Sequence, residues 1–178
     1  ATGSDLFGRN PDLVEWSAPV SGENLAAVRA LSPDVAILQA QRADAYGNAH
    51  VWGNLGASPD AARAARHVIV VAEEIVSPKV IASDPNRTVI PGFLVAAVAQ
   101  VPYGAHPSPV QGYYNRDNKY YQEYHGQTKT REEFERWLGQ WVLGARGREE
   151  YLGLLGSGRI EGLKVKKHAY AARTDFGH

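Results

Sequence analysis

Two short apolar segments, each followed at once by polar residues, constrain the fold of this chain more than any other feature. Residues 35–40 (VAILQA) and 67–72 (HVIVVA) have the length and composition of strands that are covered on both faces. Between them, Ser58-Pro59-Asp60 combines the serine, proline and acidic residue that are typical of a helix N-terminus. Strands that alternate with helices in this way predict an α/β layered domain.

The composition narrows the class of protein. The chain has 178 residues, enough for one domain with a core, and its 19 basic and 19 acidic residues leave no net charge. Nucleic-acid binding usually requires a basic surplus, and membrane crossing requires an apolar run of roughly 20 residues, so neither is expected. The first ten residues lack the pattern of a signal peptide, and the absence of cysteine excludes disulfides and thiolate chemistry. We therefore expect a soluble, cytoplasmic protein.

The rest of the chain gives a coarser pattern. Residues 1–23 read as an irregular lead-in, and the next apolar stretch, 25–31, fits either a short helix or a strand. Residues 102–126 are rich in proline, glycine and tyrosine and predict a long loop. We expect a lead-in segment over residues 1–31, one domain over 32–155 and a tail over 156–178.

Two short signals predict helices beyond the two apolar segments. Ser77-Pro78 repeats the pattern of a cap followed by proline, and Thr130 and Glu133 have the spacing of a capping box. The helix behind Thr130 is expected to run to about Leu143, and a further helical turn or two follows over residues 148–155. Residues 93–101 are apolar and remain open between helix and strand.

The first candidate site follows the strand at residues 35–40. Arg42 and Asp44 come directly after this strand, and ligands of open α/β sheets bind beyond the carboxyl ends of the strands. Gly47 and Asn48 tolerate the positive φ of a tight turn. One interpretation is a polar loop over a ligand. The other is a plain turn in which Arg42 pairs with Asp44.

Two further groups are candidates for proton chemistry. Glu73 and Glu74 follow the second strand, and paired carboxylates perform acid–base work when one pKa is raised. Alternatively, the pair is solvated, or one member anchors a neighbouring backbone. His106, in a stiff Pro- and Gly-containing loop, is either a proton carrier or a residue that fixes the loop by hydrogen bonding.

Other clusters favour structural roles. Five tyrosines between residues 113 and 124 lie among charged residues, and the zero net charge favours a subunit interface over base stacking. An apolar stripe in the helix behind Thr130 is typical of a core or an interface; it consists of Phe134, Trp137, Leu138 and Trp141. The six histidines are scattered without metal-ligand spacing, so no metal site is expected.

The motifs together resemble one known family. The stretch 33–48 (PDVAILQAQRADAYGN) looks like a segment of the A subunit of CoA-transferases, and residues 70–76 resemble the next block of that family. Pro91-Gly92, residues 101–108 (VPYGAHPS) and Gly112-Tyr113-Tyr114 with Arg116-Asp117 resemble its glutaconate CoA-transferase branch. The resemblance covers roughly residues 32–155.

This resemblance implies an open three-layer α/β/α sheet domain. It also implies transfer of CoA from an acyl-CoA to a small carboxylic acid through a glutamyl-CoA thioester. The glutamate nucleophile of the family lies on the B subunit, so the chain is expected to work as a heterodimer or heterotetramer with a B partner. A coenzyme A thioester is then a substrate, and no cofactor is permanently bound. The family's N-terminal Gly-rich loop is missing from this sequence, so the chain resembles the C-terminal portion of an A subunit.

The resemblance leaves the catalytic nucleophile to the partner and assigns this chain the walls of the site. The substrate-binding candidates are Arg42, Asp44, Asn48, Glu74 and His106. Two other functions remain open. Some relatives hydrolyse a ring in a steroid-derived CoA thioester, and the chain could also be a non-catalytic subunit that stabilises its partner.

Overall fold

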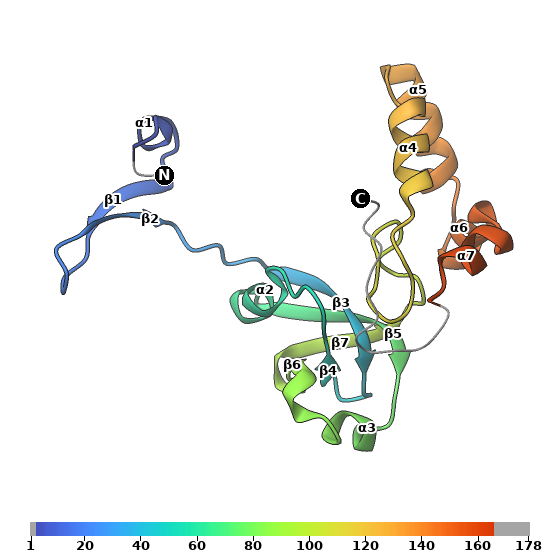
Figure 1. Cartoon of the computed structure of the whole chain (residues 1–178), viewed down its shortest axis with the longest axis horizontal. Helices are drawn as coiled ribbons and strands as arrows, with labels where there is room; N and C mark the ends of the chain where they lie inside the picture. Colours follow the sequence, from blue (N-terminus) through green and yellow to red (C-terminus); the bar gives the residue numbers. More distant parts are fainter. Residues whose placement is uncertain (1–2, 166–178) are drawn as a thin grey trace. The chain divides into compact units, whose positions relative to one another are not determined.

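The computed structural model describes residues 3–165, and the chain divides into two compact units between Pro33 and Asp34. Each unit is described by itself, and the labels of Figure 1 are used for both. Within residues 3–165, no helix is both long and apolar enough to cross a bilayer.

The first unit contains a short helix and a two-stranded sheet. Helix α1 (Leu6–Arg9) precedes β1 (Leu13–Ser17), which pairs antiparallel with β2 (Asn24–Val28). The hairpin turn is closed by the Gly22 amide, which donates to the Ala18 carbonyl at 2.8 Å. The prediction of an irregular lead-in over residues 1–23 is wrong, because β1 lies within it, whereas the strand alternative for residues 25–31 is confirmed by β2. No residue of β1 is buried, so this strand left no apolar alternation in the sequence.

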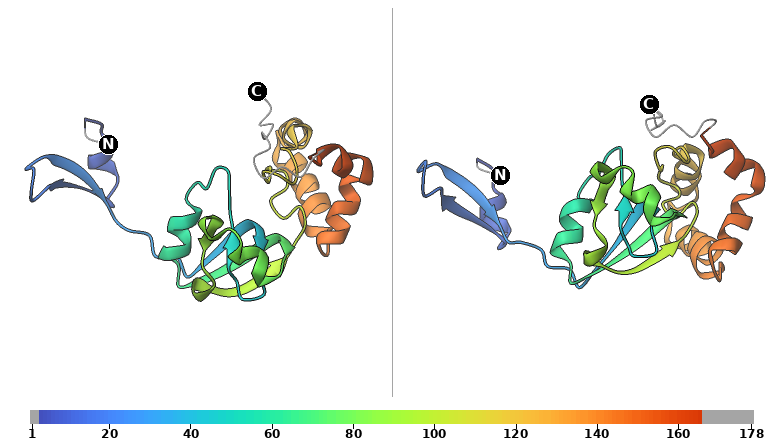
Figure 2. Two further views of the ribbon diagram at one scale, coloured as in Figure 1. Left: turned by 60° about the horizontal axis from the view of Figure 1, so that its bottom comes forward. Right: turned by 90° about the horizontal axis from the view of Figure 1, so that it is seen from below.

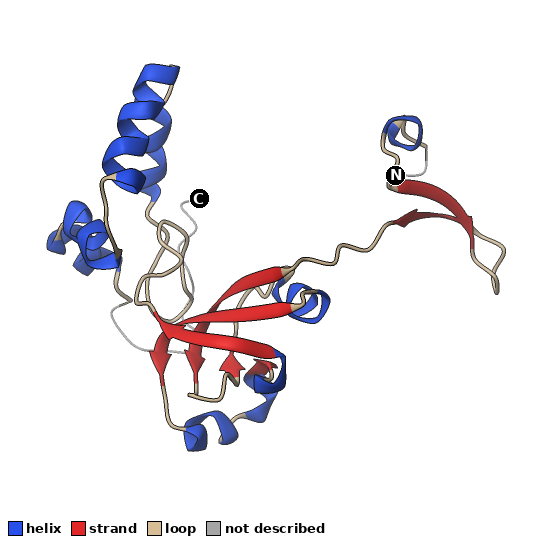
Figure 3. Cartoon of the chain, turned by 180° about the vertical axis from the view of Figure 1, so that it is seen from behind, coloured by secondary structure: helices blue, strands red, loops and turns tan. Residues whose placement is uncertain are grey.

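The second unit is built on a five-stranded mixed sheet (Figure 3). Its three longer strands are β3 (Val35–Ala43), β5 (His67–Ile75) and β7 (Val95–Gln100), which run parallel. The short strands β4 (Ala49–His50) and β6 (Thr88–Ile90) continue the sheet in antiparallel pairing, in the order β6-β4-β3-β5-β7. The parallel strands therefore finish at one common edge.

Alternation along β3 and β5 places the core on one face of the sheet. The buried residues of these strands on that face are Ala36, Leu38, Ala40, Val68, Val70 and Ala72. Helix α2 (Ser58–Ala64) lies between β4 and β5 in the chain and packs against the same core through Ala62, which is 1% exposed. On the other face of β3, Val35 and Ile37 are 48% and 68% exposed. The two apolar segments thus form neighbouring parallel strands, and the α/β prediction is confirmed. The expected cover on both faces is wrong for the first half of β3, where only the core face is buried.

The connection from β5 to β7 consists of short elements. Helix α3 (Pro78–Ala82) begins at the predicted proline, with Ser77 in the preceding extended position. Two single-turn helices, η1 (Pro85–Arg87) and η2 (Gly92–Leu94), lie on either side of β6. The stretch that the sequence left open between helix and strand becomes η2 and β7.

Helices form the part of the second unit that follows the sheet, and Figure 2 shows them gathered on one side of it. They are α4 (Asn118–Gln127), α5 (Arg131–Leu138), the π-helical turn η3 (Gly139–Leu143), α6 (Arg148–Leu155) and α7 (Ser157–Leu163). The predicted loop 102–126 is shorter than expected, because Asp117 accepts a hydrogen bond from the Tyr120 amide at 2.9 Å and caps α4. Residues 157–163 of the predicted tail are helical, and residues 166–178 lie outside the described part.

The capping box that was predicted for α5 is confirmed. The Thr130 hydroxyl accepts from the Glu133 amide at 3.2 Å, and the Glu133 carboxylate accepts from the Thr130 amide at 3.0 Å. The aromatic stripe behind it contacts α4: Trp137 lies edge-on to Tyr124, with 4.8 Å between the ring centroids. This stripe therefore packs α5 against α4.

Candidate functional site

The turn between β3 and β4 is held by its own side chains. Asp44 is 1% exposed and accepts hydrogen bonds from the amides of Tyr46 and Asn48 at 2.9 and 3.0 Å. The Asn48 side chain donates to the second Asp44 oxygen at 3.0 Å and accepts from the Gly92 amide at 2.8 Å. Gly47 has φ +86, and a Cβ atom there would lie 2.7 Å from Cβ of Val95. Asp44 and Asn48 thus fix the turn and attach it to the start of η2.

Arg42 pairs with a glutamate on the neighbouring strand. Register places it opposite Glu74, and its Nε atom lies 3.5 Å from Glu74 Oε2. The same nitrogen donates to the Tyr113 hydroxyl at 3.3 Å. Burial raises the pKa of Tyr113 to about 12, so the phenol is neutral at physiological pH. The sequence left open a pairing of Arg42 with Asp44. In the structure Arg42 pairs with Glu74 instead, and both carboxylate oxygens of Asp44 accept hydrogen bonds within the turn.

A cavity of about 190 Å³ opens where the parallel strands finish. Its lining residues are Glu73, Glu74, Pro102, Tyr103, Tyr113, Tyr114, Lys164 and Val165. The side chain of Glu74 is 40% exposed, whereas Arg42 behind it is only 16% exposed. The cavity therefore presents a carboxylate, several phenol rings and a lysine at the edge where α/β sheets bind ligands.

Glu73 has a different environment from its neighbour in sequence. It is 5% exposed, and one oxygen accepts from the Gln39 side chain at 2.7 Å and from the Tyr114 hydroxyl at 3.1 Å. Its other oxygen accepts from the Tyr103 amide at 2.7 Å. Burial raises the pKa of Glu73, while the hydrogen bonds from the Tyr103 amide and the Tyr114 hydroxyl oppose the rise. Of the roles considered for this pair, Glu73 has the geometry of a backbone anchor.

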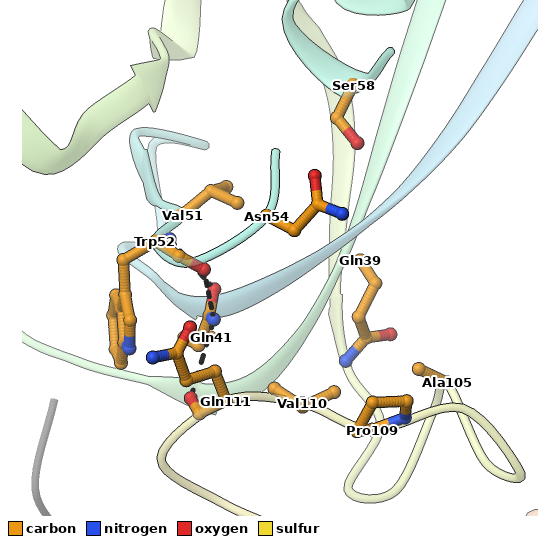
Figure 4. Close-up of a pocket in the computed structure, with 10 residues that line it drawn as sticks. All are labelled: Gln39, Gln41, Val51, Trp52, Asn54, Ser58, Ala105, Pro109, Val110 and Gln111. Atoms are coloured by element: carbon orange, nitrogen blue, oxygen red, sulfur yellow. Dashed lines mark hydrogen bonds between the residues drawn. The ribbon is translucent and has the colours of Figure 1, made fainter. Parts of the chain in front are cut away.

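A second cavity, of about 300 Å³, lies beside β3 (Figure 4). Gln41 projects between two backbone carbonyls, those of Trp52 at 2.9 Å and Gln111 at 3.5 Å, and accepts from the Trp52 amide at 3.3 Å. Gln39 and Asn54 add further amide groups to the wall. Sequence reasoning missed Gln39 and Gln41, although their period-two spacing on a strand places them on one face.

His106 belongs to a buried ion-pair network. Its Nε2 atom lies 3.0 Å from Asp117 Oδ2, and its Nδ1 atom lies 2.7 Å from the Tyr151 hydroxyl. Arg159 donates two hydrogen bonds to the same carboxylate, at 2.5 and 3.0 Å. Burial lowers the pKa of His106, and Asp117 only partly offsets this effect. His106 is not among the described residues that line either cavity.

The arrangement of Asp117 has electrostatic consequences. Burial alone would raise the pKa of Asp117, but the hydrogen bonds from Arg159 and His106 outweigh burial and hold the value at about 2. Within residues 3–165, no group of three or more histidine or acidic side chains is arranged to hold a metal ion. The structure therefore pairs Arg42 with Glu74, a residue that lines the 190 Å³ cavity, and it places Asp44, Asn48 and His106 in networks of their own.

Comparisons with known proteins agree with one family. The family model described as coenzyme A transferase matches residues 14–100. The chain is 40% identical over 157 residues to the A subunit of 3-oxoadipate CoA-transferase of Pseudomonas knackmussii, an alignment that covers 88% of this chain and 55% of that protein. It is 42% identical over 144 residues to the A subunit of glutaconate CoA-transferase of Acidaminococcus fermentans, covering 81% of this chain and 45% of that protein. The chain thus spans about half the length of these curated relatives.

Solved structures give the same picture. Glutaconate coenzyme A-transferase from Acidaminococcus fermentans superposes with a TM-score of 0.80 and 38% identity, over 89% of this chain and 51% of that chain. A variant of the decarboxylase AibA/AibB superposes with a TM-score of 0.57 and 29% identity, over 74% of this chain and 47% of that chain. The same sheet is therefore similar to proteins that carry out two different reactions.

Proposed function

We propose that this chain, which belongs to the coenzyme A transferase family, is part of an A subunit that moves CoA between an acyl-CoA and a small carboxylic acid. The observation that carries the proposal is the cavity at the carboxyl ends of β5 and β7, which is lined by Glu74, the partner of Arg42 on β3. The similarity to two proteins named as A subunits supports a B partner. A cytoplasmic location, a heteromeric assembly and the absence of a permanently bound cofactor belong to the same proposal.

The proposed reaction uses a glutamate of the B partner. Its carboxylate attacks the thioester carbonyl and the C–S bond breaks. The products are an acyl-glutamyl anhydride and the free CoA thiolate. The thiolate then attacks the glutamyl carbonyl of the anhydride, which releases the acyl group as a carboxylate and forms a glutamyl-CoA thioester. The acceptor acid reverses these two steps, so that CoA ends on the acceptor and the glutamate is regenerated.

Within this reaction, the residues of the chain act on charge and position. A carboxylic acid that approaches Glu74 meets a like charge, which costs energy at short range in a partly buried site. Arg42, at 3.5 Å, offsets that charge, and the neutral Tyr113 phenol adds a hydroxyl beside it. We assign Arg42 and Glu74 to the wall that orients the acid, and Asp44 and Asn48 to holding the turn at that wall.

The experiment that tests the proposal traps the thioester. The complex of this chain with its B partner is incubated with acyl-CoA and analysed by mass spectrometry for CoA on a partner glutamate. A transferase that works without such an adduct would contradict the mechanism. Arg42→Gln is expected to lower kcat/KM by about tenfold or more, because a charge-assisted contact contributes about 1.5–3 kcal/mol. Arg66→Gln, an arginine whose side chain is 75% exposed, serves as the matched control.

A second function, that of a non-catalytic subunit, is favoured by one observation. Asp44 and Asn48 make their hydrogen bonds within the turn and to the Gly92 amide rather than toward a cavity. A stabilising subunit predicts that Arg42→Gln leaves turnover unchanged once assembly with the partner is matched. Comparison of the variants at equal complex concentration, measured by size-exclusion chromatography, separates the two functions.

A further inference from the structure

Tyr103 has a backbone conformation that L-residues rarely adopt. Its φ is +59, and among residues 3–165 it is the only residue other than glycine with a positive φ. A bulky residue in this region costs free energy and persists only when its surroundings hold it there. Such positions cluster at functional sites, so the contacts that hold Tyr103 are informative.

Two charged side chains hold the peptide groups of Tyr103. The buried Glu73 carboxylate accepts the Tyr103 amide hydrogen at 2.7 Å, and Arg148 donates through Nη2 to the Tyr103 carbonyl. Arg148 also donates through Nε to the Pro102 carbonyl at 3.3 Å. We call Glu73 and Arg148 the Tyr103 clamp. Because its two members bind opposite ends of one residue, the clamp restrains both dihedral angles of Tyr103.

The surroundings leave the loop little room to relax. A Cβ atom at Gly104 would lie 2.6 Å from the Gln39 Oε1 atom and 2.9 Å from the Val101 carbonyl oxygen, so this residue lies tightly against the sheet. Glu73 is itself held by Gln39 and by the Tyr114 hydroxyl. The left-handed turn at Tyr103 is therefore determined by a network that begins on β3 and β5.

The fixed backbone determines where the ring lies. The Tyr103 ring stacks on Tyr114, with 4.6 Å between centroids and 30° between planes, and Tyr103 lines the 190 Å³ cavity with Glu74. Pockets for drug-sized ligands occupy about 300–1,000 Å³, so a cavity of this size suits a small acyl group. Removal of the ring would enlarge this cavity.

We propose that Tyr103 is a specificity-determining residue whose ring limits the size of the acyl group, and that Glu73 and Arg148 are positioning residues that hold this ring in place. The proposal rests on the proposed function, since it requires that the cavity receives the acyl group. The role of Tyr103 concerns the discrimination between acyl groups of different size. This discrimination can be measured from dissociation constants, without any CoA transfer.

The test compares two ligand sizes on the complex of this chain with its B partner. Non-reactive thioether analogues of acetyl-CoA and hexanoyl-CoA are titrated, and the ratio of their dissociation constants is measured. The parent protein is expected to favour the acetyl analogue. Tyr103→Gly suits a positive φ and removes the ring, so it is expected to shift the ratio toward the hexanoyl analogue by about tenfold. Tyr103→Phe, which keeps the ring, is expected to retain the parental ratio.

The Tyr103 clamp is tested by asking whether the effects of Glu73→Gln and Tyr103→Gly on the ratio add up. Glu73→Gln replaces an acceptor of the Tyr103 amide with a group that can be a donor, and it is expected to shift the ratio in the same direction as Tyr103→Gly. The double variant is expected to show no further shift, because both changes act through one ring. If Glu73→Gln does not fold, as judged by thermal unfolding, Arg148→Gln tests the same clamp from the other side. The matched control is Phe93→Ala, an aromatic residue that is 87% exposed.

The outcomes separate the two proposals. A parent complex that binds both analogues equally, or a ratio unchanged in Tyr103→Gly, overturns the role of Tyr103. Additive shifts in the double variant overturn the clamp. A complex that discriminates through Tyr103 but passes no CoA from acyl-CoA to any acid supports the role of Tyr103 and contradicts the proposed transferase function.

Discussion

Acidification should lower the free energy of unfolding through the Asp117 network, and the structure gives the size of this loss. Asp117 is 3% exposed and receives hydrogen bonds from Arg159, His106 and the Tyr120 amide. These contacts hold the pKa of Asp117 at about 2, below its ordinary value of 3.8. At about 1.4 kcal/mol per pH unit, this difference corresponds to about 2.5 kcal/mol of unfolding free energy.

The sign follows from the order of protonation. The unfolded chain takes up a proton on Asp117 near pH 4, whereas the folded chain resists it until about pH 2. The contribution of Asp117 is therefore fully present above about pH 4 and is lost as the pH falls from there toward 2. Little of it is screened by solvent, because Arg159 is itself only 18% exposed.

The assay is urea unfolding followed by tryptophan fluorescence between pH 5.5 and 2.5, on the parent and on Asp117→Asn. The parent should lose about 1.6 kcal/mol more than the variant over this range, and the variant should already be less stable at pH 5.5. Asp60→Asn, at an exposed carboxylate in the first turn of α2, controls for the loss of one acidic group. Parallel pH profiles for the parent and Asp117→Asn would refute the reasoning.

Three further predictions concern stability. Gly47→Ala should lower the unfolding free energy by about 2–4 kcal/mol in urea titrations, because it combines a positive φ with overlap on Val95; a loss below about 1 kcal/mol would contradict the contact. Thr130→Ala should cost about 1 kcal/mol in the same titrations, and an unchanged free energy of unfolding would contradict the cap. Because burial lowers the pKa of His106, the unfolded chain is protonated first, so stability should fall as the pH drops below about 6.5, and a flat profile would refute this.

Local sequence signals identified the elements whose formation depends on near neighbours. The apolar runs in residues 35–40 and 67–72 specified β3 and β5, because a strand that is buried on its core face must place apolar residues there. Thr130 and Glu133 specified the start of α5, since a capping box involves residues only three positions apart. The family motifs, spread over residues 32–155, identified the class of protein before any geometry was known.

Sequence reasoning failed where partners are distant or where burial is slight. The strand β1 buries none of its residues, and so it left no apolar period to detect. Helix α4 was not predicted, because its region is rich in tyrosine and glycine. Its first residues are capped by Asp117, which also bonds to His106 and to the distant Arg159.

The roles of the two adjacent glutamates show most clearly what each level decides. The sequence placed Glu73 and Glu74 at the end of a strand, and strand geometry requires that they point to opposite faces. The register of β5 on β3 places Glu74 opposite Arg42. Glu73 is the buried member of the pair, because the Tyr103 amide and the Tyr114 hydroxyl donate hydrogen bonds to its carboxylate. The sequence therefore determined the fold class and the edge at which the polar residues collect. Only the tertiary structure decided which carboxylate pairs with Arg42 and which one anchors the wall of the cavity, because hydrogen bonds between residues 30 to 41 positions apart make that distinction.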